Sequence, residues 1–126
     1  MNTLLSTSTI RNTTVENRQG ESLGSVKDIM LHPDSGRVEY AVLDFGGFLG
    51  IGDKLFAVPL QAFEVDRSNE RFVLDVTKDR LKEAPGFDKD NWPETANREF
   101  SEGVYDFYGH RDTYLRTRVN EPAMAN

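Results

Sequence analysis

A glycine-rich segment in the middle of the chain comes closest to a ligand-binding motif. It reads Gly46-Gly47-Phe48-Leu49-Gly50-Ile51-Gly52-Asp53-Lys54. Such loops bind phosphate when a Gly-Lys-Ser/Thr sequence opens a helix and the backbone amides point at the anion. Here Asp53 precedes Lys54 and a strand-like segment follows, so the residue order argues against phosphate binding. It favours a long hairpin connection whose glycines permit unusual φ values.

Three bulky apolar residues, Phe48, Leu49 and Ile51, lie in this loop. In one interpretation they fold back and plug the end of their own domain. In the other they form an exposed contact for a partner, because contiguous exposed apolar patches mark interaction sites. The sequence leaves both open, and we take the three as candidate interaction residues.

Residues that could catalyse a reaction or bind a metal are isolated from one another. His32 and His110 are the only histidines, and neither has a second ligand at metal-binding spacing. Ser22, Ser25 and Ser35 lack the Gly-x-Ser-x-Gly motif of a nucleophile. No pattern pairs two carboxylates in an evident cleft. We therefore expect a protein that is not an enzyme and that has no cofactor and no metal.

The length and composition are those of one ordinary globular domain. The chain has 126 residues and no cysteine, which predicts a core without disulfides and favours a reducing compartment. The N-terminus has no basic region followed by an apolar core, and no apolar run is long enough to span a bilayer. We expect a cytoplasmic protein with no membrane insertion.

The net charge of −6 is spread evenly along the chain. Residues 1–80 carry 12 acidic and 9 basic residues, and residues 81–126 carry 9 and 6. Because non-specific nucleic-acid binding needs clustered Lys and Arg, we expect no direct nucleic-acid partner. One basic cluster contains Arg111, Arg116 and Arg118. A contact with RNA would explain it, but a solvated tail explains it equally well.

The elements that would hold these residues are mostly strands. Turn signals recur at residues 19–21, 32–36, 46–52 and 66–70, with segments rich in β-branched and aromatic residues between them. This spacing is typical of an all-β sandwich or barrel. The strand from Val38 is apolar on both faces, so either a helix of the same chain or a partner subunit must cover its second face.

Two helices are predicted after the strands. Thr77 is a suitable N-cap for a short helix over residues 78–84, which Pro85-Gly86 ends. Residues 85–93 read as a loop. A second helix is expected over residues 94–108, with Gly109 as its C-cap glycine.

The second helix carries an apolar stripe of Phe100, Val104, Phe107 and Tyr108, at i, i+4, i+7 and i+8. The stripe packs either on the strands of its own chain or against a second subunit. Trp92, just before this helix, is a suitable anchor for either contact, because large aromatic side chains can dominate the energetics of an interface. We add these five residues to the candidate interaction residues.

Several landmarks occur in the order found in PRC-barrel domains. Residues 17–30 (NRQGESLGSVKDIM) resemble the opening hairpin of that family, and the turn at residues 34–37, the apolar strand after it and residues 46–59 resemble its next parts. The resemblance covers about residues 10–80. PRC-barrels are small β-barrels found in the H subunit of photosynthetic reaction centres, in a bacterial ribosome-maturation factor and in stand-alone bacterial and archaeal proteins. The resemblance implies a barrel that serves as a docking module for other macromolecules.

The chain departs from the first two of these members. It has no membrane helix like that of the reaction-centre subunit and no preceding domain like that of the maturation factor. Its C-terminal part resembles the extension of some stand-alone members. We therefore predict an all-β fold, a small PRC-type β-barrel of about six strands with a C-terminal helical extension. The predicted parts are a flexible N-terminal arm (1–12), the barrel domain (13–80), the helical extension (81–119) and a disordered tail (120–126).

The two-faced strand, the apolar loop and the aromatic helix offer more apolar surface than one small barrel would cover. We therefore predict a non-enzymatic interaction module of the bacterial stand-alone type, a homodimer that docks a protein partner. The alternative is a ribosome- or RNA-processing-associated factor that acts through protein contacts.

Overall fold

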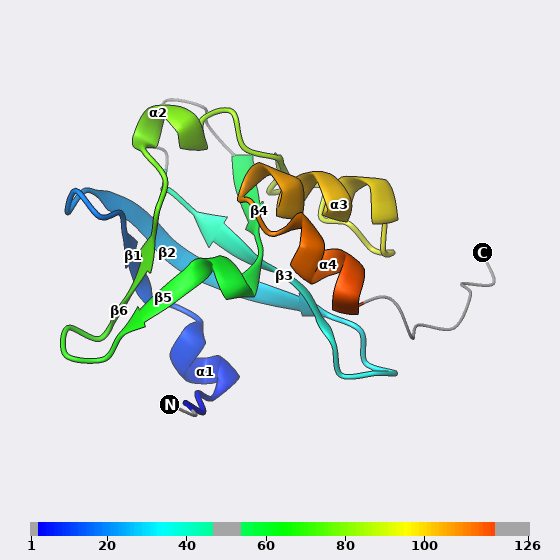
Figure 1. The fold of residues 1–126 in the computed structure, drawn as a ribbon, viewed down its shortest axis with the longest axis horizontal. Helices are drawn as coiled ribbons and strands as arrows, with labels where there is room; N and C mark the ends of the chain where they lie inside the picture. Colours follow the sequence, from blue (N-terminus) through cyan, green and yellow to red (C-terminus); the bar gives the residue numbers. More distant parts are fainter. Residues whose placement is uncertain (1–2, 47–53, 118–126) are drawn as a thin grey trace.

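A computed structural model describes residues 3–46 and 54–117 of the chain (Figure 1). Its strands are β1 (Thr14–Glu16), β2 (Ser22–Leu31), β3 (Val38–Asp44), β4 (Lys54–Val58), β5 (Phe63–Asp66), β6 (Arg71–Leu74) and β7 (Gly86–Asp88). Its helices are α1 (Thr7–Ile10), the 3-10 turn η1 (Leu60–Ala62), α2 (Lys78–Leu81), α3 (Arg98–Phe107) and α4 (Arg111–Thr117). No helix within these described ranges is long and apolar enough to cross a membrane.

The strands form one mixed sheet in the order β5-β6-β1-β2-β3-β4-β7. Every neighbouring pair is antiparallel except β1 and β6, which run parallel. The strand-rich domain and the C-terminal helices that we expected are present. The described pairing is nevertheless an open order that ends at β5 and β7, and within the described residues no pairing joins these two strands into a closed ring.

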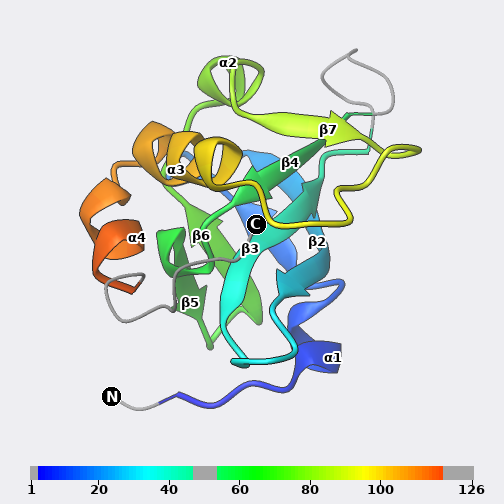
Figure 2. The same ribbon diagram turned by 90° about the vertical axis from the view of Figure 1, so that its right-hand side faces the viewer.

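The strand β7 lies where we predicted a loop, in residues 85–93. It is short, and it adds to the edge of β4 with Gly86 opposite Phe56 (Figure 2). A Cβ atom on Gly86 would lie 2.1 Å from the carbonyl oxygen of Leu55, so only glycine permits this close approach. The prediction was wrong because Pro85-Gly86 signals a break, whereas here the glycine allows a strand to pair.

The C-terminal helices differ from the prediction in their limits. The N-cap Thr77 of α2 is confirmed, since its side chain accepts a hydrogen bond from the Arg80 amide. The second helix begins four residues later than expected, because Asn97 caps it by accepting from the Phe100 amide at 3.1 Å. It ends where expected, at Gly109 with φ +76°.

The helix α4 was not predicted, because its basic residues suggested a solvated tail. Its Tyr114 is buried and packs on Tyr105 of α3 with the ring centroids 4.9 Å apart. This aromatic contact, together with the ion pair between Arg111 of α4 and Glu102 of α3 at 3.4 Å, holds the short helix against the helix before it.

Two apolar clusters lie on opposite faces of the central strands. The larger contains Ala41 and Leu43 of β3, and the smaller contains Tyr40 and Val42 together with Val104 of α3. The prediction that β3 is covered on both faces is confirmed, and the second cover is α3 and α4 of the same chain (Figure 1). The N-terminal segment also contributes, since Ile10 of α1 is buried in the larger cluster.

Candidate functional site

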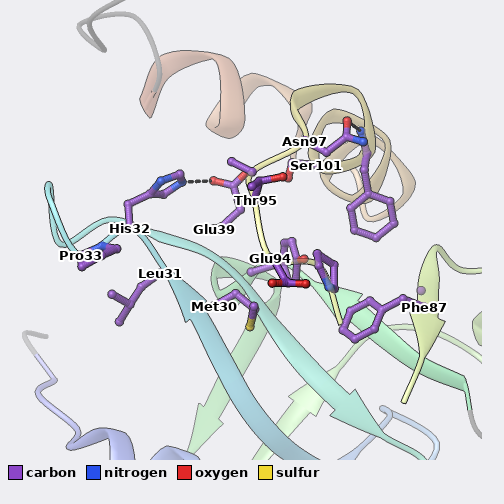
Figure 3. Close-up of a pocket in the computed structure, with 15 residues that line it drawn as sticks. Met30, Leu31, His32, Pro33, Glu39, Phe87, Glu94, Thr95, Asn97 and Ser101 are labelled. Carbon is purple, nitrogen blue, oxygen red and sulfur yellow. Dashed lines mark hydrogen bonds and ion pairs between the residues drawn. The ribbon is translucent and has the colours of Figure 1, made fainter. Parts of the chain in front are cut away.

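An open groove of about 540 Å³ lies between the end of the β2–β3 hairpin and the segment that enters α3 (Figure 3). The hairpin supplies one wall, from Met30 to Pro33 and at Glu39 and Tyr40. The other wall comes from residues 86–87, 93–97 and 100–101. Two parts of the chain that are far apart in the sequence therefore build one site.

A β-bulge at Glu39 aims a carboxylate into this groove. Met30 pairs with Tyr40 and Leu31 pairs with Val38, so Glu39 is the extra residue on β3. A bulge breaks the alternation of a strand and redirects a side chain. As a result, Glu39 and Tyr40 both line the groove, although strict alternation places them on opposite faces.

The imidazole of His32 is the partner of this carboxylate. His32 Nε2 lies 2.8 Å from Glu39 Oε1, and the Glu39 side chain is only 8% exposed. A carboxylate this deeply buried requires such a partner, since an unpaired buried charge costs several kcal/mol. The backbone of Glu39 is also fixed by α3, because the Tyr105 hydroxyl donates a hydrogen bond to the Glu39 carbonyl oxygen at 2.7 Å.

Aromatic rings form the apolar walls of the groove. Phe100 meets Tyr40 edge-on at 5.8 Å between centroids, and Phe87 meets Trp92 at 5.4 Å. Burial, and next the nearby Glu39 carboxylate, raise the pKa of Tyr40 to about 12, so its phenol stays neutral. Leu31 remains 48% exposed at the rim. The groove thus offers apolar contact area beside a buried carboxylate.

Ser101 of α3 is a buried polar residue in the wall. Its residue is 1% exposed, and its Oγ has no hydrogen-bond partner within the described part of the chain. Ser101, His32 and Glu39 are the residue types of a hydrolase triad. A serine nucleophile needs a base bonded to its hydroxyl, and here His32 Nε2 bonds the carboxylate while Ser101 Oγ bonds nothing described.

The structure separates the predicted interaction residues into three groups. Phe100 lines the groove. Trp92 is not in the groove lining but packs on Phe87, which is. Val104 is fully buried in the smaller cluster. Phe107 and Tyr108 pack against the larger cluster instead. Phe48, Leu49 and Ile51 lie outside the described residues.

Phe107 and Tyr108 line a second, smaller hollow of about 310 Å³ beside α2. The Arg80 guanidinium lies 4.1 Å from the centroid of the Phe107 ring. Burial raises the pKa of Tyr108, and its hydroxyl has no hydrogen-bond partner among the described residues. Its described lining contains no histidine, and its carboxylate, Asp75, lies 3.9 Å from Nε of Arg18.

Sequence reasoning missed His32 and Glu39 as a pair. We interpreted His32 as a turn residue without a second ligand, which overlooked that a hairpin brings residues 32 and 39 together. The signal was the turn itself: the His32 amide donates to the Arg37 carbonyl, and the Gly36 amide donates to His32. Within the described ranges, no three His, Asp or Glu side chains gather as a metal-ligand set.

The comparison with family models covers most of the sheet. The family model of the PRC-barrel domain matches residues 2–81, which include β1 to β6. A curated protein of Deinococcus radiodurans, named only as an uncharacterized protein, is 34% identical over 64 residues, or 51% of this chain. That match spans 22% of the relative's length. One wall of the groove therefore lies within the matched region and the other lies beyond it.

Proposed function

The chain belongs to the PRC-barrel domain family, and we propose that it is a non-enzymatic interaction module that holds a segment of a partner protein in the groove beside α3. One observation carries this proposal: the groove is open, aromatic and rimmed by an exposed leucine, Leu31. Exposed apolar surface in a concave site is typical of sites that bind polypeptide.

The composition of the groove supports a binding role over catalysis. Its buried carboxylate is already bonded to His32, and its serine is not bonded to a base.

The absence of cysteine fits a protein that works in the cytoplasm.

A peptide library displayed on phage tests this role directly. We expect wild-type protein to enrich peptides that no longer bind after Leu31→Asp, because the substitution puts a charge on the apolar rim. The control is Leu115→Asp on α4, where a leucine of similar exposure, 37%, lies outside the groove lining. Peptides that bind both variants equally, or the absence of enriched peptides, would contradict the proposal.

We also propose that the module is a homodimer, formed through the outer strand β5. The other side of β5 has no pairing within the described sheet, and its Val65 is 45% exposed. An edge strand of this kind offers unpaired backbone groups to a second copy. The groove lies elsewhere, so each copy would keep its groove free for a partner, as an adaptor requires.

Light scattering during size-exclusion chromatography tests the dimer. We expect the mass of two chains at micromolar concentration, and one chain for Val65→Lys, because an edge lysine opposes strand pairing. Leu115→Lys should leave the mass unchanged. A monomeric wild type would remove the homodimer but leave the groove proposal standing.

A further inference from the structure

We propose that the groove selects an arginine side chain of the segment that it binds. This inference rests on the proposed function and adds the chemistry of the ligand. It follows from three properties of the groove lining: the sign of its charges, the aromatic walls and the buried polar atoms.

The charged residues of the groove lining are almost all acidic. Glu39 and Glu94 line it, and neither Lys nor Arg is among the described lining residues. His32 is the only basic residue there, and it is bonded to Glu39. The Glu39 carboxylate is buried, so its attraction for a cation is less screened than on an open surface, and the exposed Glu94 adds a second negative charge.

The aromatic walls favour a guanidinium over an ammonium group. Phe87 and Phe100 line the groove and are partly exposed, and the buried Tyr40 packs against Phe100. A planar guanidinium stacks on aromatic rings and is less strongly hydrated than an ammonium. The same chemistry already occurs elsewhere in this chain, where the Arg80 guanidinium lies over the Phe107 ring.

The N-terminus of α3 carries a partial positive charge, which by itself would attract an anion. Here Asn97 already accepts the hydrogen bond of the Phe100 amide, and Glu99 lies in the first turn. Both reduce the attraction for an anion. The Ser101 hydroxyl, buried in the wall and without a described partner, adds an oxygen that can accept a hydrogen bond from a guanidinium.

The charge of the whole chain acts in the same direction. The net charge of −6 speeds the approach of a basic segment and slows that of an acidic one. Long-range attraction thus agrees with the short-range chemistry of the groove.

The test is a titration of the ¹⁵N-labelled full chain with acetylated and amidated tripeptides, followed by amide chemical shifts. We expect Ala-Arg-Ala to shift groove amides and to bind at least about tenfold more tightly than its citrulline counterpart, which has the same shape without the charge. Ala-Lys-Ala should bind more weakly than Ala-Arg-Ala. Equal binding of the citrulline or lysine peptide, or no groove shifts at about 20 mM Ala-Arg-Ala, would overturn the inference.

Charge variants separate the groove from the general charge of the chain. Glu39→Gln and Glu94→Gln should each weaken binding of the arginine peptide several-fold. Glu83→Gln, at a position that follows α2 and is not in the groove lining, removes the same charge and should have no effect. Glu94 is exposed, so its variant stays informative if Glu39→Gln disturbs folding. Unchanged binding by Glu94→Gln would count against the assignment.

A failure of the arginine inference can be distinguished from a failure of the proposed function. If the phage library enriches Leu31-dependent peptides that contain no arginine, the module binds polypeptide and only the arginine inference is wrong.

Discussion

At the scale of single residues, Gly24 occupies a position that no other residue fits. Its φ is +97°, and a Cβ atom there would lie 2.1 Å from the carbonyl oxygen of Asp44 on the neighbouring strand. A glycine is therefore required both by the backbone angle and by the close approach of β3.

We expect Gly24→Ala to lower the free energy of unfolding by about 3 kcal/mol or more, because strain and backbone overlap add. Gly36→Ala is the matched control, since Gly36 also has a positive φ but no atom within 4 Å of the added Cβ. It should cost only about 1 kcal/mol. Urea denaturation measures both, and equal losses would show that the contact with Asp44 is unimportant.

Removing either of two buried tyrosine hydroxyls should affect the stability of the chain differently. Tyr105→Phe deletes the hydrogen bond to the Glu39 carbonyl and should cost about 1–3 kcal/mol. Tyr108→Phe removes a hydroxyl without a described partner and should change stability by less than about 0.5 kcal/mol or increase it. Thermal unfolding compares the two, and a large loss at Tyr108 would reveal a partner for its hydroxyl.

The residues of the groove show what a sequence can and cannot predict at this scale. Phe100 and Trp92 were chosen as candidate interaction residues from residue type and spacing, and of the two Phe100 lines the groove. Glu39 was missed because a β-bulge has no reliable sequence signal and reverses the side on which a strand residue lies.

At the scale of elements, the start of α3 decides the shape of the groove. Asn97 caps the helix and also lines the groove, so the cap fixes where residues 94–97 lead into the helix. If the helix began at residue 94, as we expected, residues 94–97 would be helical. They would then not form the irregular segment that contributes to one wall of the groove.

We expect Asn97→Ala to destabilise the chain by about 1 kcal/mol and to weaken ligand binding, because the wall loses its fixed position. Asn97→Asp retains a capping oxygen and should preserve stability. Chemical denaturation and circular dichroism check this. Equal stability of the two variants would mean that tertiary contacts alone fix the start of α3.

β3 was predicted because its β-branched and aromatic residues lie between two turn signals and are apolar on both faces. β7 and α4 were not, since each is short and depends on contacts with another element: β7 pairs with β4, and α4 packs on α3 through Tyr114 and Arg111. Local propensity carries little information where tertiary contacts decide the conformation.

At the scale of the whole molecule, the helical extension is part of the fold. Tyr40 and Val42 of β3 are buried beneath α3 and α4, so the central strands would expose an apolar face without the extension. Because β3 supplies both clusters, loosening either one weakens the other. The sheet and the extension should therefore unfold together.

Trp92, the single tryptophan, allows this coupling to be tested. It packs against the smaller cluster, so its fluorescence follows the extension, whereas far-ultraviolet circular dichroism follows the whole chain. We expect the two urea transitions to coincide. Val104→Ala, which removes two buried methyl groups, should shift both curves together by about 2 kcal/mol. If the fluorescence transition moved alone, the extension would be an independent unit, and its wall of the groove could open without unfolding the sheet.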